Sequence, residues 1–217
     1  MVEEKLHPTP GKVKMKKPID FRPPDVKEVG LKFVARQESE DGKLLVHYLH
    51  YDQLYFVQAA ELTPYAKGLL EGKLMGTRCP ICGDKFFPPR VNCWNLDCEL
   101  EKCEWVEIKP YGRVHTFTTA GWSGRSSLKN LPFVLAYCVL DDCKTAIANY
   151  LKNIEPWDAQ FNMPIKVEFV PKEKRVGAIT DFYFVPTDDW KPGPMTPEKE
   201  RIKKLCQPIF EWVKTLK

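Results

Sequence analysis

Five of the eight cysteines in this chain fall between residues 76 and 112. They are arranged as Cys79-x2-Cys82, then Cys93-x4-Cys98, then Cys103. A short Cys loop brings two sulfur atoms to one side of a turn, and a metal ion joins two such turns into a tetrahedral site. Four thiolates bind Zn2+ well and leave no position open for water. The pattern therefore predicts a structural zinc ribbon with Cys79, Cys82, Cys93 and Cys98 as ligands.

The fourth ligand has an alternative in Cys103, which would leave nine residues between it and Cys93. Cys98 is favoured because it keeps the second loop short. An iron site with similar ligands remains an alternative to zinc. Disulfides are not expected, because the opening residues MVEEKLHPTP lack the apolar core of a signal peptide. A redox-active pair at Cys79 and Cys82 is disfavoured by the two prolines that follow soon after.

Composition limits the functional classes. A chain of 217 residues with 43% apolar content can bury a core, as one domain plus a small satellite. Its net charge of +4 is too mild to indicate a dedicated nucleic-acid binder. No apolar run approaches the length that crosses a bilayer, so we expect a soluble cytoplasmic protein without a membrane partner.

The order of the segments predicts a mainly β protein. The expected parts are an extended arm over 1–30, a β-hairpin and helix over 31–75, a rubredoxin-like zinc ribbon over 76–110, an OB-fold domain over 111–187 and a C-terminal amphipathic helix over 188–217. The arm is rich in lysine and proline and has no periodic apolar face. It is either a disordered tail or an extended strap on a partner subunit, and the sequence leaves both open.

Two local signals define the segment before the ribbon. Asp41-Gly42 lies between two β-rich runs, which predicts a hairpin over residues 31–57. A helix over residues 61–76 is expected to begin with Thr63 as its N-cap and Pro64 at its first position. Its apolar stripe is expected to pack over the ribbon.

Five runs with β character follow the ribbon, at 111–119, 133–140, 144–150, 165–170 and 175–185. An irregular insert separates the third run from the fourth, which matches the plan of a five-stranded OB barrel. The last segment predicts an amphipathic helix that is broken or kinked before Pro208. Its expected apolar side consists of Ile202, Leu205, Ile209, Phe210 and Val213.

Two stretches carry a family resemblance. They are EGKLMGTRCPICGDKFFPPR at 71–90 and CEWVEIKPYGRVHTFT at 103–118. They resemble the family that joins a rubredoxin-like zinc ribbon to an OB domain and associates with acyl-CoA enzymes, as accessory subunits of thiolases, acyl-CoA hydratases and aldolases. The resemblance covers residues 63–187. The family usually has Cys-x2-Cys as its second pair, whereas this chain has Cys93-x4-Cys98, which leaves the fourth ligand in question.

The resemblance implies a non-catalytic, zinc-binding subunit of an acyl-CoA thiolase complex that cleaves a 3-oxoacyl-CoA. The terminal extensions resemble those of the small subunits of benzoylsuccinyl-CoA thiolases, which act in aromatic degradation. The implied partner is a thiolase-type catalytic subunit, and the implied ligand of the complex is a coenzyme A thioester. The residues implied near the coenzyme entrance are Lys85, Phe86, Arg90, Trp122 and Arg125. Phosphates favour Arg and Lys, and adenine accepts aromatic stacking.

Each of these five residues also has a structural interpretation, since Phe86 fits a ribbon core equally well. The loop over residues 120–132 is the favoured group, because it is polar, contains glycine and lies between two expected strands. Two other classes stay open. A nucleic-acid binder would use barrel aromatics as a stacking platform, but residues 111–187 show little basic surplus. A pure scaffold would bridge two acyl-CoA enzymes without touching ligand.

Overall fold

The computed structural model describes residues 30–38, 45–52, 59–123 and 125–216. The chain divides into two compact units, 1–58 and 59–217. In the first unit, strands β1 (Gly30–Glu38) and β2 (Leu45–Asp52) form an antiparallel hairpin with an irregularity between Phe33 and Ala35. The expected Asp41-Gly42 turn and the extended arm lie outside the described residues.

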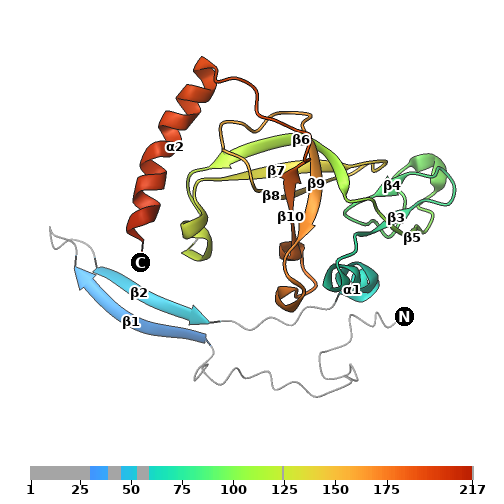
Figure 1. Cartoon of the computed structure of the whole chain (residues 1–217). Helices are drawn as coiled ribbons and strands as arrows, with labels where there is room; N and C mark the ends of the chain where they lie inside the picture. Colours follow the sequence, from blue (N-terminus) through green and yellow to red (C-terminus); the bar gives the residue numbers. More distant parts are fainter. Residues whose placement is uncertain (1–29, 39–44, 53–58, 124, 217) are drawn as a thin grey trace. The chain divides into compact units, whose positions relative to one another are not determined.

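The second unit is built on a closed barrel of five strands (Figure 1). They are β6 (Tyr111–Ala120), β7 (Phe133–Leu140), β8 (Ala146–Leu151), β9 (Pro164–Phe169) and β10 (Phe182–Pro186). Their order around the barrel is β10-β8-β7-β6-β9. β10 runs parallel to β8, while the other neighbouring pairs are antiparallel. The mainly β fold class with a five-stranded OB-type barrel is confirmed.

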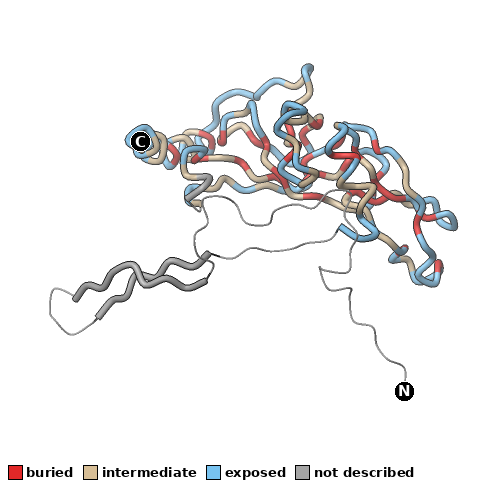
Figure 2. The backbone as a smooth tube through the Cα atoms, turned by 90° about the horizontal axis from the view of Figure 1, so that it is seen from below, coloured by how far each residue is buried: buried red, intermediate tan, exposed pale blue. Residues whose placement is uncertain are grey.

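Alternation along the strands fills the barrel with apolar side chains. In β7 the buried residues are every second one, from Val134 to Leu140. A strand turns successive side chains to opposite faces, so this period of two places one set inside the barrel. Phe182 and Phe184 of β10 contribute two fully buried rings whose centroids are 5.9 Å apart. Figure 2 shows the buried segments running through the barrel and the adjoining ribbon.

The last barrel strand begins later than the sequence predicted. Residues 175–181 were expected to open a strand, but they form a turn that is held by the buried carboxylate of Asp181. The backbone N–H groups of Val176, Gly177 and Ala178 donate to this carboxylate at 2.6–3.3 Å. Gly177 has φ +78°, a left-handed conformation that favours glycine over a strand residue. These local hydrogen bonds replace the expected ladder.

Helix α1 (Thr63–Glu71) packs into the core of the barrel. Leu69 is fully buried there, and the Tyr65 ring lies 5.9 Å from the ring of Phe87. Gly68 of the helix also lies against the side chain of Met75 in the ribbon, so the helix packs against the barrel as well as the ribbon. The N-cap is Leu62 rather than Thr63, whose hydroxyl donates to the carbonyl of Ala60 at 2.6 Å.

The ribbon is a three-stranded sheet in the order β4-β3-β5, made of β3 (Met75–Arg78), β4 (Lys85–Phe86) and β5 (Glu104–Glu107). Two hydrogen bonds join it to the turn between β7 and β8. Lys144 N–H donates to the Lys85 carbonyl at 2.8 Å, and Phe87 N–H donates to Thr145 Oγ1 at 2.8 Å. Ribbon and barrel thus share backbone pairing.

Helix α2 (Pro197–Thr215) is continuous through Pro208, so the helix is not broken there. Proline removes only one helical hydrogen bond, and docking of the helix offsets that loss. Lys199 Nζ lies 2.7 Å from Asp158 Oδ1 in a mostly buried ion pair, and Phe210 meets Trp157 edge to face. Leu205 is exposed, so it does not belong to the packed face. Among the described residues, neither helix is long and apolar enough to cross a bilayer.

We predict that Asp181→Ala lowers the free energy of unfolding of this unit by about 3 kcal/mol, because three backbone N–H groups lose their buried acceptor. Urea unfolding followed by fluorescence measures the change. Asp188→Ala is the matched control, since Asp188 is an exposed carboxylate paired with Lys166 and should leave the midpoint nearly unchanged. Equal midpoints for the two variants would contradict the role given to Asp181.

Candidate metal centre

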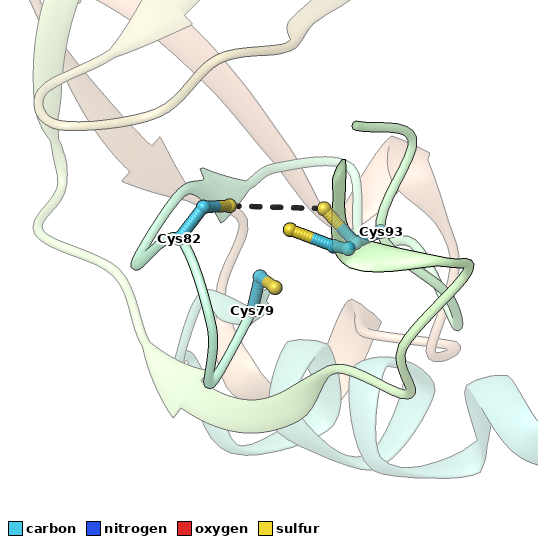
Figure 3. A group of neighbouring side chains, drawn as sticks. Cys79, Cys82 and Cys93 are labelled. Atoms are coloured by element: carbon cyan, nitrogen blue, oxygen red, sulfur yellow. Dashed lines mark hydrogen bonds between the residues drawn. The ribbon is translucent and has the colours of Figure 1, made fainter. Parts of the chain in front are cut away.

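The structure brings four cysteine sulfurs together at the end of the ribbon. The Sγ atoms of Cys79, Cys82, Cys93 and Cys98 all lie within 4.8 Å of one another. Cys82 and Cys93 are 3.8 Å apart (Figure 3). All four are free thiols. A tetrahedron with metal–sulfur bonds of about 2.3 Å has edges of about 3.8 Å, so the spacing fits Zn2+.

The first pair sits on a tight turn between β3 and β4. Gly83 N–H donates to the Cys79 carbonyl at 3.0 Å, and Cys79 N–H donates to the Asp84 carbonyl at 2.9 Å. Gly83 has φ +79°, where a side chain would strain the backbone. The turn therefore needs glycine directly after Cys82, as the sequence has it.

The second pair spans a longer loop that contains a 3-10 turn at Leu96–Cys98. The side chain of Asn95 accepts a hydrogen bond from Asp97 N–H at 3.1 Å, and Cys98 N–H donates to the Asn95 carbonyl at 3.0 Å. This turn folds the four intervening residues compactly. It accommodates the x4 spacing and returns Cys98 to the first pair.

Cys103 lies in the same buried cluster but outside the group of four sulfurs. Its N–H donates to the Val91 carbonyl at 2.8 Å. Burial raises the pKa of its thiol to about 11, and the neighbouring cysteines add to the effect. The geometry thus favours Cys98 over Cys103 as the fourth donor.

The electrostatics of the cage call for a cation. Burial raises the pKa of Cys98 to about 12, and contacts with the sulfurs of Cys82 and Cys79 act in the same direction. Burial also opposes ionisation of Cys79, but hydrogen bonds from the backbone N–H groups of Cys82 and Ile81 lower its pKa to about 7. Four thiolates packed this closely repel one another unless a cation compensates their charge.

The donor set fits a closed structural site. The four cysteines would hold Zn2+, which supplies folding energy by tying the two turns together. With four protein donors there is no open position for a water or a substrate. The buried ring of Phe86 packs within the same cluster.

The five residues expected near the coenzyme do not converge on one place. Lys85 forms an ion pair with Asp142 at 3.7 Å, and the Arg90 guanidinium lies 5.5 Å from the centre of the Trp94 ring. Phe86 is fully buried and has no surface to offer a ligand. Trp122 is 81% exposed in the loop after β6, where Arg125 begins the 3-10 turn Arg125–Asn130.

Lys85, Phe86 and Arg90 form a ribbon group, and Trp122 and Arg125 form a loop group. The register of β6 and β7 gives the distance between these two groups. Gly112 pairs with Leu140 at one end of this hairpin, and Ala120 pairs with Phe133 at the other. The eight residue steps between them correspond to roughly 26 Å of strand. Lys85 bridges to Cys143 just beyond the first end, while Trp122 follows the second. The ribbon group and the loop group therefore lie at opposite ends of the barrel.

Sequence reasoning missed a cavity beside the loop at 120–132. It has a volume of about 390 Å3 and is lined by Asn130, Phe133, Tyr150 and Lys152, among others. The Phe133 and Tyr150 rings meet edge to face at 4.8 Å, and Lys152 Nζ lies 3.9 Å from the centre of the Tyr183 ring. No local motif marks this cavity, because neighbouring strands bring its walls together.

We predict that Cys98→Ala lowers the zinc content of the purified chain from about one per chain to near zero, because three thiolates hold the metal far more weakly than four. Cys103→Ala is the matched control and should keep about one zinc per chain. Elemental analysis after dialysis against a mild chelator gives the readout. Zinc retained by the first variant and lost by the second would make Cys103 the fourth ligand.

No family profile matches the chain. It is 29% identical over 112 residues to a DUF35 domain-containing scaffold protein of Methanocaldococcus jannaschii, a match that covers 51% of this chain and 78% of that protein. Among solved structures it resembles the Ltp2–ChsH2(DUF35) aldolase, with a TM-score of 0.46, 18% identity and coverage of 62% of this chain and 98% of that one. A DUF35-family protein of unknown function from Sulfolobus solfataricus has a TM-score of 0.42 and 19% identity, covering 57% and 82%. The sequence similarity is therefore to a protein that contains a DUF35 domain.

Proposed function

We propose that this chain is a non-catalytic, zinc-binding subunit of an acyl-CoA thiolase complex. It docks on the catalytic subunit and helps to shape the entrance for the coenzyme and substrate. The catalytic subunit cleaves a 3-oxoacyl-CoA by thiolysis, and we propose benzoylsuccinyl-CoA as the substrate. Zn2+ has a structural role in this assignment, and the proposed location of the complex is the cytoplasm.

The observation that carries the proposal is that the cysteine thiols outside the group of four are buried and have raised pKa values. A thiolase needs an activated cysteine that attacks the acyl group. The cysteines outside the group of four are all buried: Cys103, Cys138, Cys143 and Cys206. Burial raises the pKa of Cys138 to about 12 and that of Cys143 to about 11, so both are neutral thiols at physiological pH. The acylated cysteine then has to belong to another subunit.

The relative from Methanocaldococcus jannaschii supports a scaffolding role, because it is itself named a scaffold protein. A closed cysteine cage agrees with such a role, since it stabilises a fold and offers no reactive position. A scaffold holds another protein in place, and the exposed surfaces of ribbon and barrel are available for that purpose.

For the coenzyme entrance we propose the loop at 120–132 and the cavity beside it. Trp122 exposes an indole that can stack on adenine, and Lys152 supplies a cation at the cavity wall. The ribbon residues Lys85 and Arg90 lie at the other end of the barrel and are left to other contacts.

The test is purification of the tagged full chain from its native source. We expect a thiolase-type subunit to co-elute in fixed ratio, and thiolysis of benzoylsuccinyl-CoA to require both subunits. Nucleic acid in the eluate without an enzyme would overturn the proposal in favour of an OB-type nucleic-acid binder. Thiolysis by the catalytic subunit alone at the full rate would reduce this chain to a scaffold.

We further predict that Trp122→Ala raises the KM for coenzyme A in the complex by about tenfold, because an exposed aromatic stacking contact is lost. The thiolysis assay at varied coenzyme concentration measures this change. Tyr111→Ala is the control, because Tyr111 is a half-exposed aromatic at the opposite end of β6 and should leave KM unchanged. An equal KM for both variants would move the coenzyme away from this loop.

A further inference from the structure

Large apolar side chains are exposed around the metal centre. The relative exposures are 61% for Ile81, 50% for Trp94, 90% for Leu96 and 68% for Leu100. Isolated exposed apolar residues are ordinary, but a contiguous group of them on a small domain usually marks an interaction site. We refer to these four residues as the ribbon tip.

The cysteines of the cage hold the backbone positions of the ribbon tip close to one another. Ile81 directly precedes Cys82, and Trp94 directly follows Cys93. The sulfurs of those two cysteines are 3.8 Å apart. Leu96 lies in the loop that runs from Trp94 to Cys98, so it shares the same end of the ribbon.

Hydrogen bonds fix the loop that presents the two leucines. Asn92 Nδ2 donates to the Leu100 carbonyl at 2.7 Å, and Glu101 N–H donates to the Cys98 carbonyl at 2.8 Å. Glu99 and Leu100 both have left-handed backbones, with φ +47° and φ +59°. Bulky residues rarely adopt this conformation, and such positions cluster at binding sites. The leucines are therefore displayed by a defined backbone, and binding need not order the loop.

Carboxylates alternate with these apolar residues. Asp97, Glu99 and Glu101 are all exposed, and among the described residues none of them forms an ion pair. Of the nearby cations, Lys102 is engaged with Glu61 at 3.7 Å, and the Arg90 guanidinium lies 5.5 Å from the centre of the Trp94 ring. The part of the tip around Leu96 and Leu100 thus shows an apolar surface with an acidic rim.

We propose that the ribbon tip docks a protein partner whose contact surface is apolar and bordered by Arg and Lys. Such a surface is complementary to the tip, because its apolar centre meets the apolar residues and its positive charges face the acidic rim. The acidic rim repels nucleic-acid phosphates and anionic lipid headgroups, so neither fits as the occupant. The proposal rests on the proposed function in that the partner is the enzyme subunit this chain accompanies.

The test uses the zinc-loaded full chain and the protein subunit that co-purifies with it in fixed ratio, identified by mass spectrometry. Affinity is measured by biolayer interferometry for the wild type and for the double variant Leu96→Ser/Leu100→Ser. We expect the variant to bind at least about tenfold more weakly with unchanged zinc content, because exposed apolar anchors carry much of the binding energy. Leu205→Ser is the matched control: Leu205 is 67% exposed on α2, and its change should alter affinity by less than about twofold.

Charge provides an independent readout. Glu99→Gln/Glu101→Gln should weaken binding in about 50 mM NaCl, because two carboxylates that attract the partner's Arg and Lys are lost. The affinity should also depend less on salt concentration, because fewer charge pairs remain for salt to screen. Unchanged affinity in both double variants, or tighter binding after neutralisation, would overturn the proposal. So would co-purification with no protein, or self-association of the chain that the double leucine variant abolishes in ultracentrifugation. The identity of the co-purifying protein tests the proposed function. The loss of affinity in the tip variants tests the docking site. The proposed function and the docking proposal can therefore fail independently.

Discussion

The clustering of four sulfurs within 4.8 Å is the constraint on which the ribbon depends. The ribbon sheet has only three short strands, too few to bury a core of its own. A metal ion held by both turns would supply the missing stabilisation. Phe86 links the ribbon to the rest of the unit. It lies in the cysteine cluster, while the next residue, Phe87, lies in the barrel core. Two consecutive rings, at the last residue of β4 and the residue after it, therefore connect the two cores.

This connection explains how a small metal site can orient a larger domain. Backbone pairing between Lys85 and the β7–β8 turn fixes the ribbon at one end of the barrel. The loop at 120–132 and helix α2 occupy the opposite end, where Ile209 approaches Gly121. The second unit therefore presents two separate surfaces at opposite ends of the barrel. This arrangement agrees with the proposed function, in which one end binds a partner and the other lies at the coenzyme entrance.

Most of the fold could be predicted from short-range patterns. The cysteine pairs, the glycine after Cys82 and the alternating strands each follow from local geometry, and the structure has them where the sequence indicated. The differences from the prediction have two physical origins. The turn at 175–181 is set by local hydrogen bonds to the Asp181 carboxylate, which an alternating β pattern does not reveal. Helix α2 continues through Pro208 because contacts distant in sequence, at Lys199 and Phe210, anchor it.

The candidate site shows the same limit. Sequence spacing groups the cysteines, but it gives no sign that Lys85 and Trp122 face opposite ends of the barrel. It also cannot distinguish a ring that packs under the cage from one that meets a ligand, so Phe86 was an equal candidate until its burial was known. The exposure of the ribbon tip could not be predicted for the opposite reason: Leu96 and Leu100 resemble core residues in the sequence but are exposed in the structure.

X-ray absorption at the zinc edge of the purified full chain distinguishes a closed four-thiolate site from an open one. We predict a first shell of four sulfurs at about 2.3 Å, with no nitrogen or oxygen neighbour. A shell with an oxygen or nitrogen donor would mean that the site is open or uses other residues. The metal could then take part in chemistry, and the assignment of a closed structural centre in a non-catalytic subunit would be contradicted.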